Sequence, residues 1–152
     1  MFITLFLLTY ALDTTLLNKP TKITVRNKPF RRFTLDDSLK LKNSDDKVKI
    51  LQADSKSYYL TINKKVICHL TDNTVNVCKN GFNRSKNWEI IPLRYKGYLI
   101  RSYTKNSKSD RLCMKHDEMK EGIVLDRCDK YDDSLRWDVG ENDFMHSGYE
   151  IK

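Results

Sequence analysis

The sequence predicts an all-β domain built from repeated units of short strands. Apolar and polar residues alternate through most of the chain after Thr21, whereas the spacing typical of amphipathic helices is scarce. One order of cysteines and tryptophan occurs twice. The length of 152 residues suits a single domain, because two separate cores would each be too small to bury much apolar surface.

The predicted strands are short and are separated by polar turns. Alternation with a period of two residues is typical of strands that bury one face. It occurs at 22–26, 39–42, 47–50, 59–62, 74–77 and 136–139. Polar clusters at 43–46 and 79–81 favour turns. Strands of this length and spacing predict a sandwich or a barrel.

Two segments of the chain share one order of features. Each contains two cysteines followed by a tryptophan, an acidic residue and an aliphatic residue: Cys68, Cys78 and Trp88-Glu89-Ile90 in one, and Cys113, Cys128 and Trp137-Asp138-Val139 in the other. An upstream segment around Val48-Lys49-Ile50 fits a third unit without cysteines. Three units of four strands predict twelve strands, and units that close on one another leave no free sheet edge.

The repeated pattern resembles the repeat of the ricin B-type lectin family. The family elements Cys-hydrophobic, V-x-L-x-x-Cys and Q-x-W correspond here to Leu112-Cys113-Met114, to residues 123–128 and to Leu135-Arg136-Trp137. The resemblance implies a β-trefoil over residues 15–152, with repeats at about 21–54, 58–95 and 98–142. It also implies that Trp88 and Trp137 are structural core residues. The alternative is another all-β barrel with two disulfides inside hairpins.

The four cysteines favour disulfides over a metal site. Zinc bound by Cys68, His69 and Cys78 is the alternative, but no pair has the C-x2-C spacing typical of zinc sites. Four cysteines allow three connectivities. Because the repeat places each local pair on adjacent strands, we predict the disulfides Cys68–Cys78 and Cys113–Cys128.

The resemblance also implies where a sugar would bind. The family uses an Asp two residues after the first cysteine, an aromatic ring before the second and an amide at the Gln of Q-x-W. The corresponding residues here are Lys115, Asp126 and Leu135 in the last repeat and Leu70, Asn76 and Lys86 in the middle repeat. Neither repeat keeps the galactose-binding set. Lys115 and Asp126 are retained as candidate ligand contacts.

The charge of the chain favours an acidic ligand. The formal net charge is +8, and six cations lie within fourteen residues that contain no acid: Lys19, Lys22, Arg26, Lys28, Arg31 and Arg32. Arg binds sulfate and phosphate groups through two parallel hydrogen bonds. The last four of these cations are the candidate contacts for an anionic glycan, and a solvated surface is the alternative. An exported protein meets sulfated glycans more often than nucleic acid, so nucleic acid is not expected as a partner.

The motifs favour a binding module over an enzyme. No G-x-S-x-G, H-E-x-x-H, Gly-rich phosphate loop or C-x-x-C is present, and we expect no catalysis, cofactor or metal. Asn83-Arg84-Ser85 is a candidate N-glycosylation site. We predict binding of carbohydrate or a glycoprotein, with an anionic glycan favoured over galactose. The alternative is a protein-binding coat or adhesion trefoil. Replacing Arg31 and Arg32 with Ala should weaken retention on a heparin-type column and change thermal stability little.

The first residues predict export. Residues 2–12 carry no charge, and the run is shorter than the roughly 20 residues that span a bilayer as a helix. We predict a secretory signal peptide at residues 1–14 and a secreted protein, with a first core strand as the alternative. The mature protein should begin near Leu12 to Thr15, which N-terminal sequencing of secreted material checks. An intact Met1 in folded, soluble protein would contradict this prediction.

Overall fold

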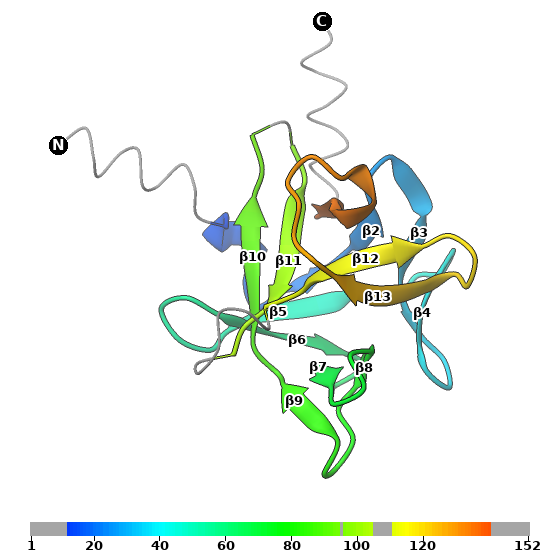
Figure 1. Cartoon of the computed structure of the whole chain (residues 1–152). Helices are drawn as coiled ribbons and strands as arrows, with labels where there is room; N and C mark the ends of the chain where they lie inside the picture. Colours follow the sequence, from blue (N-terminus) through cyan, green and yellow to red (C-terminus); the bar gives the residue numbers. More distant parts are fainter. Residues whose placement is uncertain (1–11, 95, 105–110, 141–152) are drawn as a thin grey trace, which may run out of the picture.

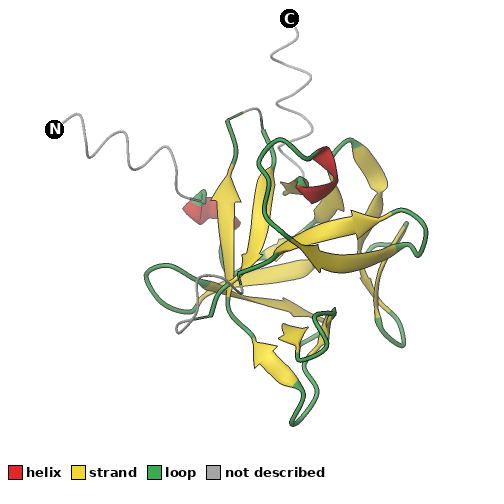
Figure 2. Cartoon of the chain, viewed as in Figure 1, coloured by secondary structure: helices red, strands yellow, loops and turns green. Residues whose placement is uncertain are grey.

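The computed structural model describes residues 12–94, 96–104 and 111–140 (Figures 1 and 2). No α-helix occurs in these ranges, so the all-β prediction is confirmed. The strands are β1 (Pro20–Thr21), β2 (Ile23–Val25), β3 (Lys28–Leu35), β4 (Leu39–Lys42), β5 (Val48–Gln52), β6 (Tyr58–Ile62), β7 (Lys65–Leu70), β8 (Val75–Val77), β9 (Asn83–Ser85), β10 (Trp88–Pro92), β11 (Tyr98–Ser102), β12 (Cys113–Asp117), β13 (Gly122–Asp126) and β14 (Trp137–Val139). The 3-10 helices are η1 (Thr14–Leu16) and η2 (Asp133–Leu135).

The described strands number fourteen, two more than predicted. The strand predicted at 22–26 corresponds to β2, and β1 and β9 are two additional short strands. The main hydrogen-bonded series runs β1-β5-β6-β10-β11-β14-β2-β3-β4. One residue, Lys22, separates β1 from β2 in the sequence. The part of the series that starts at β1 and ends at β2 therefore begins and ends next to this residue.

Three hairpins, β3–β4, β7–β8 and β12–β13, contact one another (Figure 1). The Leu41 amide of β4 donates to the carbonyl of Glu121 at 2.9 Å, in the turn between β12 and β13. Thr74 forms a bridge with Val124 of β13. The Leu39 amide donates to Asn76 Oδ1 at 3.1 Å, which joins β4 to β8. Main-chain polar groups of each hairpin are therefore satisfied by a neighbouring hairpin.

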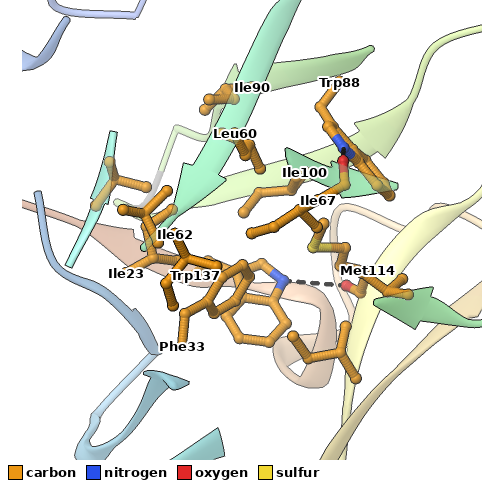
Figure 3. Close-up of a cluster of buried hydrophobic side chains, with 14 of the residues drawn as sticks. Ile23, Phe33, Leu60, Ile62, Ile67, Trp88, Ile90, Ile100, Met114 and Trp137 are labelled. Atoms are coloured by element: carbon orange, nitrogen blue, oxygen red, sulfur yellow. Dashed lines mark hydrogen bonds between the residues drawn. The ribbon is translucent and has the colours of Figure 1, made fainter. Parts of the chain in front are cut away.

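The core is built from the inward-facing residues of the alternating strands, and two indoles lie within it (Figure 3). Trp88 and Trp137 are both 0% exposed. Trp88 Nε1 donates to the carbonyl of Ile67 at 2.9 Å, and Trp137 Nε1 donates to that of Met114 at 3.0 Å. In each unit the tryptophan therefore joins its strand to the first strand of its own hairpin. The Phe33 ring meets Trp137 edge-on, with ring centroids 5.4 Å apart.

The disulfides occupy matching places in the two cysteine-containing units. They join Cys68 to Cys78 and Cys113 to Cys128, as predicted. Cys68 faces Asn76 across its hairpin, and Cys113 faces Asp126. Each partner cysteine lies two residues beyond the residue that faces the first one. A zinc site at Cys68 and Cys78 is excluded in this arrangement, because both sulfur atoms are consumed by the disulfide.

The described chain begins inside the segment predicted to be removed. Leu12 is 4% exposed and belongs to the core cluster, and Asp13 Oδ1 accepts from the Thr15 amide at the start of η1. A mature chain that starts at Leu12 keeps these contacts. The remainder of the predicted signal peptide, residues 1–11, and the predicted domain end, residues 141–152, lie outside the described ranges. None of the described residues forms a helix long and apolar enough to cross a membrane.

We predict that Trp137→Ala lowers the free energy of unfolding by about 3–5 kcal/mol. The substitution removes a fully buried ring and leaves the Met114 carbonyl without its donor. Tyr131→Ala is the matched control, because this ring is 76% exposed and its loss should change stability by no more than about 0.5 kcal/mol. Urea denaturation with the disulfides intact measures both variants. Equal losses in the two would contradict the core position of Trp137.

Candidate ligand-binding clefts

Three of the cations predicted to bind an anion have acidic partners in the structure. Arg26 Nη1 lies 2.7 Å from Asp138 Oδ1. Lys28 Nζ lies 2.7 Å from Glu118 Oε1, and Arg31 Nη1 lies 3.1 Å from Glu121 Oε1. The basic tract contains no acid of its own, but the fold brings carboxylates to it from segments 90 to 112 residues away. Three of its six cations are therefore paired with carboxylates.

Arg32, the fourth cation, has a structural role. It is 7% exposed, and its Nε and Nη2 donate to the carbonyl of Asp46 at 3.1 and 2.5 Å. The Asp46 carboxylate in turn accepts from the Leu35 amide at 2.8 Å. These bonds join β3 to the segment before β5. Because Arg32 is buried and bonded in this way, it is not available to an external anion. We also revise the expectation that replacing Arg32 changes thermal stability little.

The rest of the basic tract faces a small hollow. Lys19 and Lys22 line a cavity of about 210 Å³ together with Lys47 and Gly140. Lys47 comes from outside the tract, in the segment that leads into β5. The described residues that line this hollow include three cations and no carboxylate.

In the last repeat, the positions that carry the sugar site in the resembling family are occupied by internal contacts. Lys115 Nζ lies 3.1 Å from Asp126 Oδ2 and 3.9 Å from Asp132 Oδ2. The hydrogen bond that Lys115 donates to Asp126 raises the pKa of Lys115, and hydrogen bonds from the Arg127 amide and from Lys115 lower the pKa of Asp126. Leu135 is buried in a core cluster. The structure thus places an ion pair and an aliphatic side chain where a galactose site needs an acceptor, a ring and an amide.

A cleft among the described residues lies along β9 and beside the Cys68–Cys78 disulfide. Its volume is about 670 Å³, and we call it the main cleft. Its lining includes Asn83, Arg84, Ser85, Lys86, Asn87, Tyr103 and Thr104, and no carboxylate. Volumes of this order are typical of sites for small molecules and sugars.

Short hydrogen bonds hold the walls of the main cleft in place. Asn83 Oδ1 accepts from the Lys79 amide at 2.7 Å, which orients the start of β9. Ser85 Oγ donates to the carbonyl of Tyr103 at 2.5 Å, and Asn87 Nδ2 donates to Ser57 Oγ at 2.9 Å. β9 itself pairs with β7, where His69 faces Ser85. The side chains between these anchors, including Arg84, are exposed on the cleft rim.

The chemistry of the main cleft suits an anionic ligand with a ring. Arg84 and Lys86 supply exposed cations, and an Arg side chain can hold an oxyanion through paired hydrogen bonds. Tyr103 supplies an aromatic ring, whose centroid lies 4.7 Å from the Arg111 guanidinium carbon. Sequence reasoning named Lys86 only at the amide position of the middle repeat and did not bring Arg84, Lys86 and Tyr103 together. The available signal was the stretch 73–88, which contains Lys79, Arg84 and Lys86 but no acid.

Asn83, the candidate glycosylation residue, is exposed and lines the same cleft. A glycan attached there would begin at the cleft rim. Glycosylation of this residue remains a prediction, and it makes the glycosylation state a variable to control in binding experiments.

A buried serine–histidine–asparagine group has the residue types of a catalytic site but not the access. His69 Nδ1 lies 2.7 Å from Ser102 Oγ, and His69 Nε2 lies 2.7 Å from Asn73 Oδ1. His69 and Ser102 are both fully buried, so no substrate can reach the hydroxyl. The bonds join β7 to β11 and satisfy a polar group inside the core. This group is structural.

The structure shows an all-β domain with two disulfides. The comparisons with known proteins do not narrow this class further. No group of three or more His, Cys, Asp or Glu residues that could hold a metal ion occurs among the residues described. No protein-family model and no curated protein matches the chain.

We predict that Arg32→Ala lowers the free energy of unfolding by about 1–3 kcal/mol, because it removes a buried donor and leaves the Asp46 carbonyl unpaired. Arg31→Ala is the matched control. Its ion pair with Glu121 is exposed, and its loss should cost no more than about 1 kcal/mol. Chemical denaturation of the two single variants checks the difference. Indistinguishable midpoints would argue against a structural role for Arg32.

Proposed function

We propose that the chain is a secreted, non-enzymatic β-trefoil module that binds an anionic carbohydrate. The observation that carries the proposal is the main cleft, where Arg84, Lys86 and Tyr103 face one space and the described lining residues include no carboxylate. A sulfated or carboxylated sugar offers the two features this set can bind, an oxyanion and a ring face.

The trefoil part of the proposal is supported by the equivalence of the units. Each contributes a hairpin to the cluster of three, and two of them repeat the same indole-to-carbonyl bond and the same disulfide. The strand series that starts at β1 returns to β2, one residue further along the chain. Such a return is expected of repeats that close around a common axis.

Secretion is supported by the covalent structure. Disulfides form and persist in oxidising compartments. The two bridges join cysteines that are 10 and 15 residues apart in the sequence. The net charge of +8 would draw the protein to the anionic glycans it meets there.

A second function, binding of a protein partner, is favoured by one surface. Phe30 and Met119 are large apolar side chains that are mostly exposed. Both lie beside the ion pairs that join β3 to the turn between β12 and β13. Exposed apolar side chains surrounded by charges are typical of protein contact sites.

Retention on a heparin-type column tests the primary proposal. We predict that Arg84→Ala/Lys86→Ala elutes at clearly lower salt than the unaltered protein, with binding weakened about tenfold or more. Retention should fall steeply with added salt, since screening acts over about 8 Å at physiological ionic strength. A lactose column should retain neither protein.

Lys120→Ala/Arg127→Ala is the matched control, because it removes one Lys and one Arg from exposed positions outside the main cleft. It should elute close to the unaltered protein. Equal shifts in the two double variants would mean that total charge alone drives retention. Salt-independent lactose binding would refute the anionic ligand. No retention of any glycan would favour the protein-contact function. All proteins are compared in one glycosylation state because Asn83 lies at the cleft.

A further inference from the structure

A second, smaller pocket lies at the opposite end of β10 from the main cleft. Its volume is about 140 Å³, and it is lined by Leu93, Arg94, Lys130, Tyr131 and Arg136. Leu93 and Arg94 follow β10, Lys130 and Tyr131 precede η2, and Arg136 precedes β14. We call it the Arg136 pocket. No carboxylate is among its lining residues.

Arg136 gives this pocket a rigid cationic wall. The residue is 8% exposed, and its two terminal nitrogens donate to main-chain carbonyls, Nη1 to Lys96 at 3.1 Å and Nη2 to Lys130 at 2.8 Å. These bonds hold the planar guanidinium in one orientation between two loops. Each terminal nitrogen carries a second N–H, so the group keeps donors beyond those two bonds. A donor fixed in this way binds without the usual loss of side-chain entropy.

The rim adds two cations and a ring. Arg94 and Lys130 are exposed, as is Tyr131, whose ring centroid lies 5.2 Å from Lys130 Nζ. Asp133 lies 3.4 Å from Arg136 Nε, and its side chain extends into solvent. The described residues that line the pocket include three cations, Arg94, Lys130 and Arg136, and no acidic side chain.

We propose that the Arg136 pocket is a subsite for a tetrahedral oxyanion, such as the sulfate group of a sulfated sugar. The volume is about that of five water molecules, which suits one sulfate or phosphate group but not a whole oligosaccharide. The exposed Tyr131 ring would then contact the sugar that carries the group. Only this sugar contact rests on the proposed function. The oxyanion site stands on the geometry of Arg136, Arg94 and Lys130.

The subsite is separate from the main cleft. β10 has five residues, which corresponds to about 17 Å of extended chain, and the two sites lie at its two ends. A single oxyanion cannot contact both. Substitutions in one site therefore leave the other in place, and each can be tested alone.

Titration of the full-length, isotope-labelled protein with sodium sulfate tests the proposal by NMR, with sodium chloride at equal ionic strength as the reference. Amide signals from Gly97 and from residues 130–136 should shift to saturation with sulfate and hardly move with chloride. Arg94→Ala/Lys130→Ala should weaken this binding about tenfold or more, because it removes two charged donors from exposed positions and leaves the core intact. Lys120→Ala/Arg127→Ala should bind sulfate as the unaltered protein does.

Two further arms identify the source of the oxyanion. Inorganic phosphate that saturates the same signals would support a general oxyanion site. A sulfated disaccharide that binds more tightly than inorganic sulfate, and loses this gain in Tyr131→Ala, would support the sugar contact. Unsaturable shifts, or equal sulfate binding by Arg94→Ala/Lys130→Ala, would overturn the subsite. Heparin retention through Arg84 and Lys86 would then still stand or fall on its own experiment.

Discussion

The bond from each buried indole to the main chain is the contact on which the arrangement of the units depends. Trp88 and Trp137 are fully buried, and each has one polar hydrogen that must find an acceptor inside the core. The acceptors are the carbonyls of Ile67 and Met114, in the first strand of each hairpin. This requirement fixes how far each hairpin can move from the strand that carries its tryptophan, and the disulfide then fixes the two arms of the hairpin to each other.

Once the hairpins are held in place, their contacts decide which charges meet. The turn between β12 and β13 approaches β3, so Glu118 and Glu121 reach Lys28 and Arg31. Two cations of a tract that is strongly basic in the sequence are thereby paired with carboxylates on the surface. Other cations line the clefts at the two ends of β10: Arg84 and Lys86 at one end, and Arg94, Lys130 and Arg136 at the other. The candidate sites are thus a consequence of how the hairpins pack.

The main cleft and the Arg136 pocket together would give the protein two points of attachment to a polyanion. They differ in kind. The main cleft is broad and its cations are exposed, whereas the Arg136 pocket holds one guanidinium rigidly and is small. A chain long enough to follow β10 could occupy both, and the second contact would then form at high effective concentration. This arrangement would favour long, repeatedly charged glycans over short neutral ones.

The sequence by itself determined the features that depend on neighbours along the chain. The alternation of apolar and polar residues predicted the strands, because it shows which side of each strand is apolar. The disulfides could be predicted because their cysteines lie only 10 and 15 residues apart within hairpins. The additional short strands β1 and β9 could not be predicted from the sequence, since both depend on which strands lie alongside. Only the tertiary structure decided the sites. Whether Arg26 is available depends on Asp138, which is 112 residues away, and the orientation of Arg136 depends on the carbonyl of Lys96, 40 residues away. Charge pairing and pocket formation depend on residues that are distant in the sequence. The order of cations along the chain therefore could not distinguish Arg31, which has an acidic partner, from Arg84, which is exposed at a cleft.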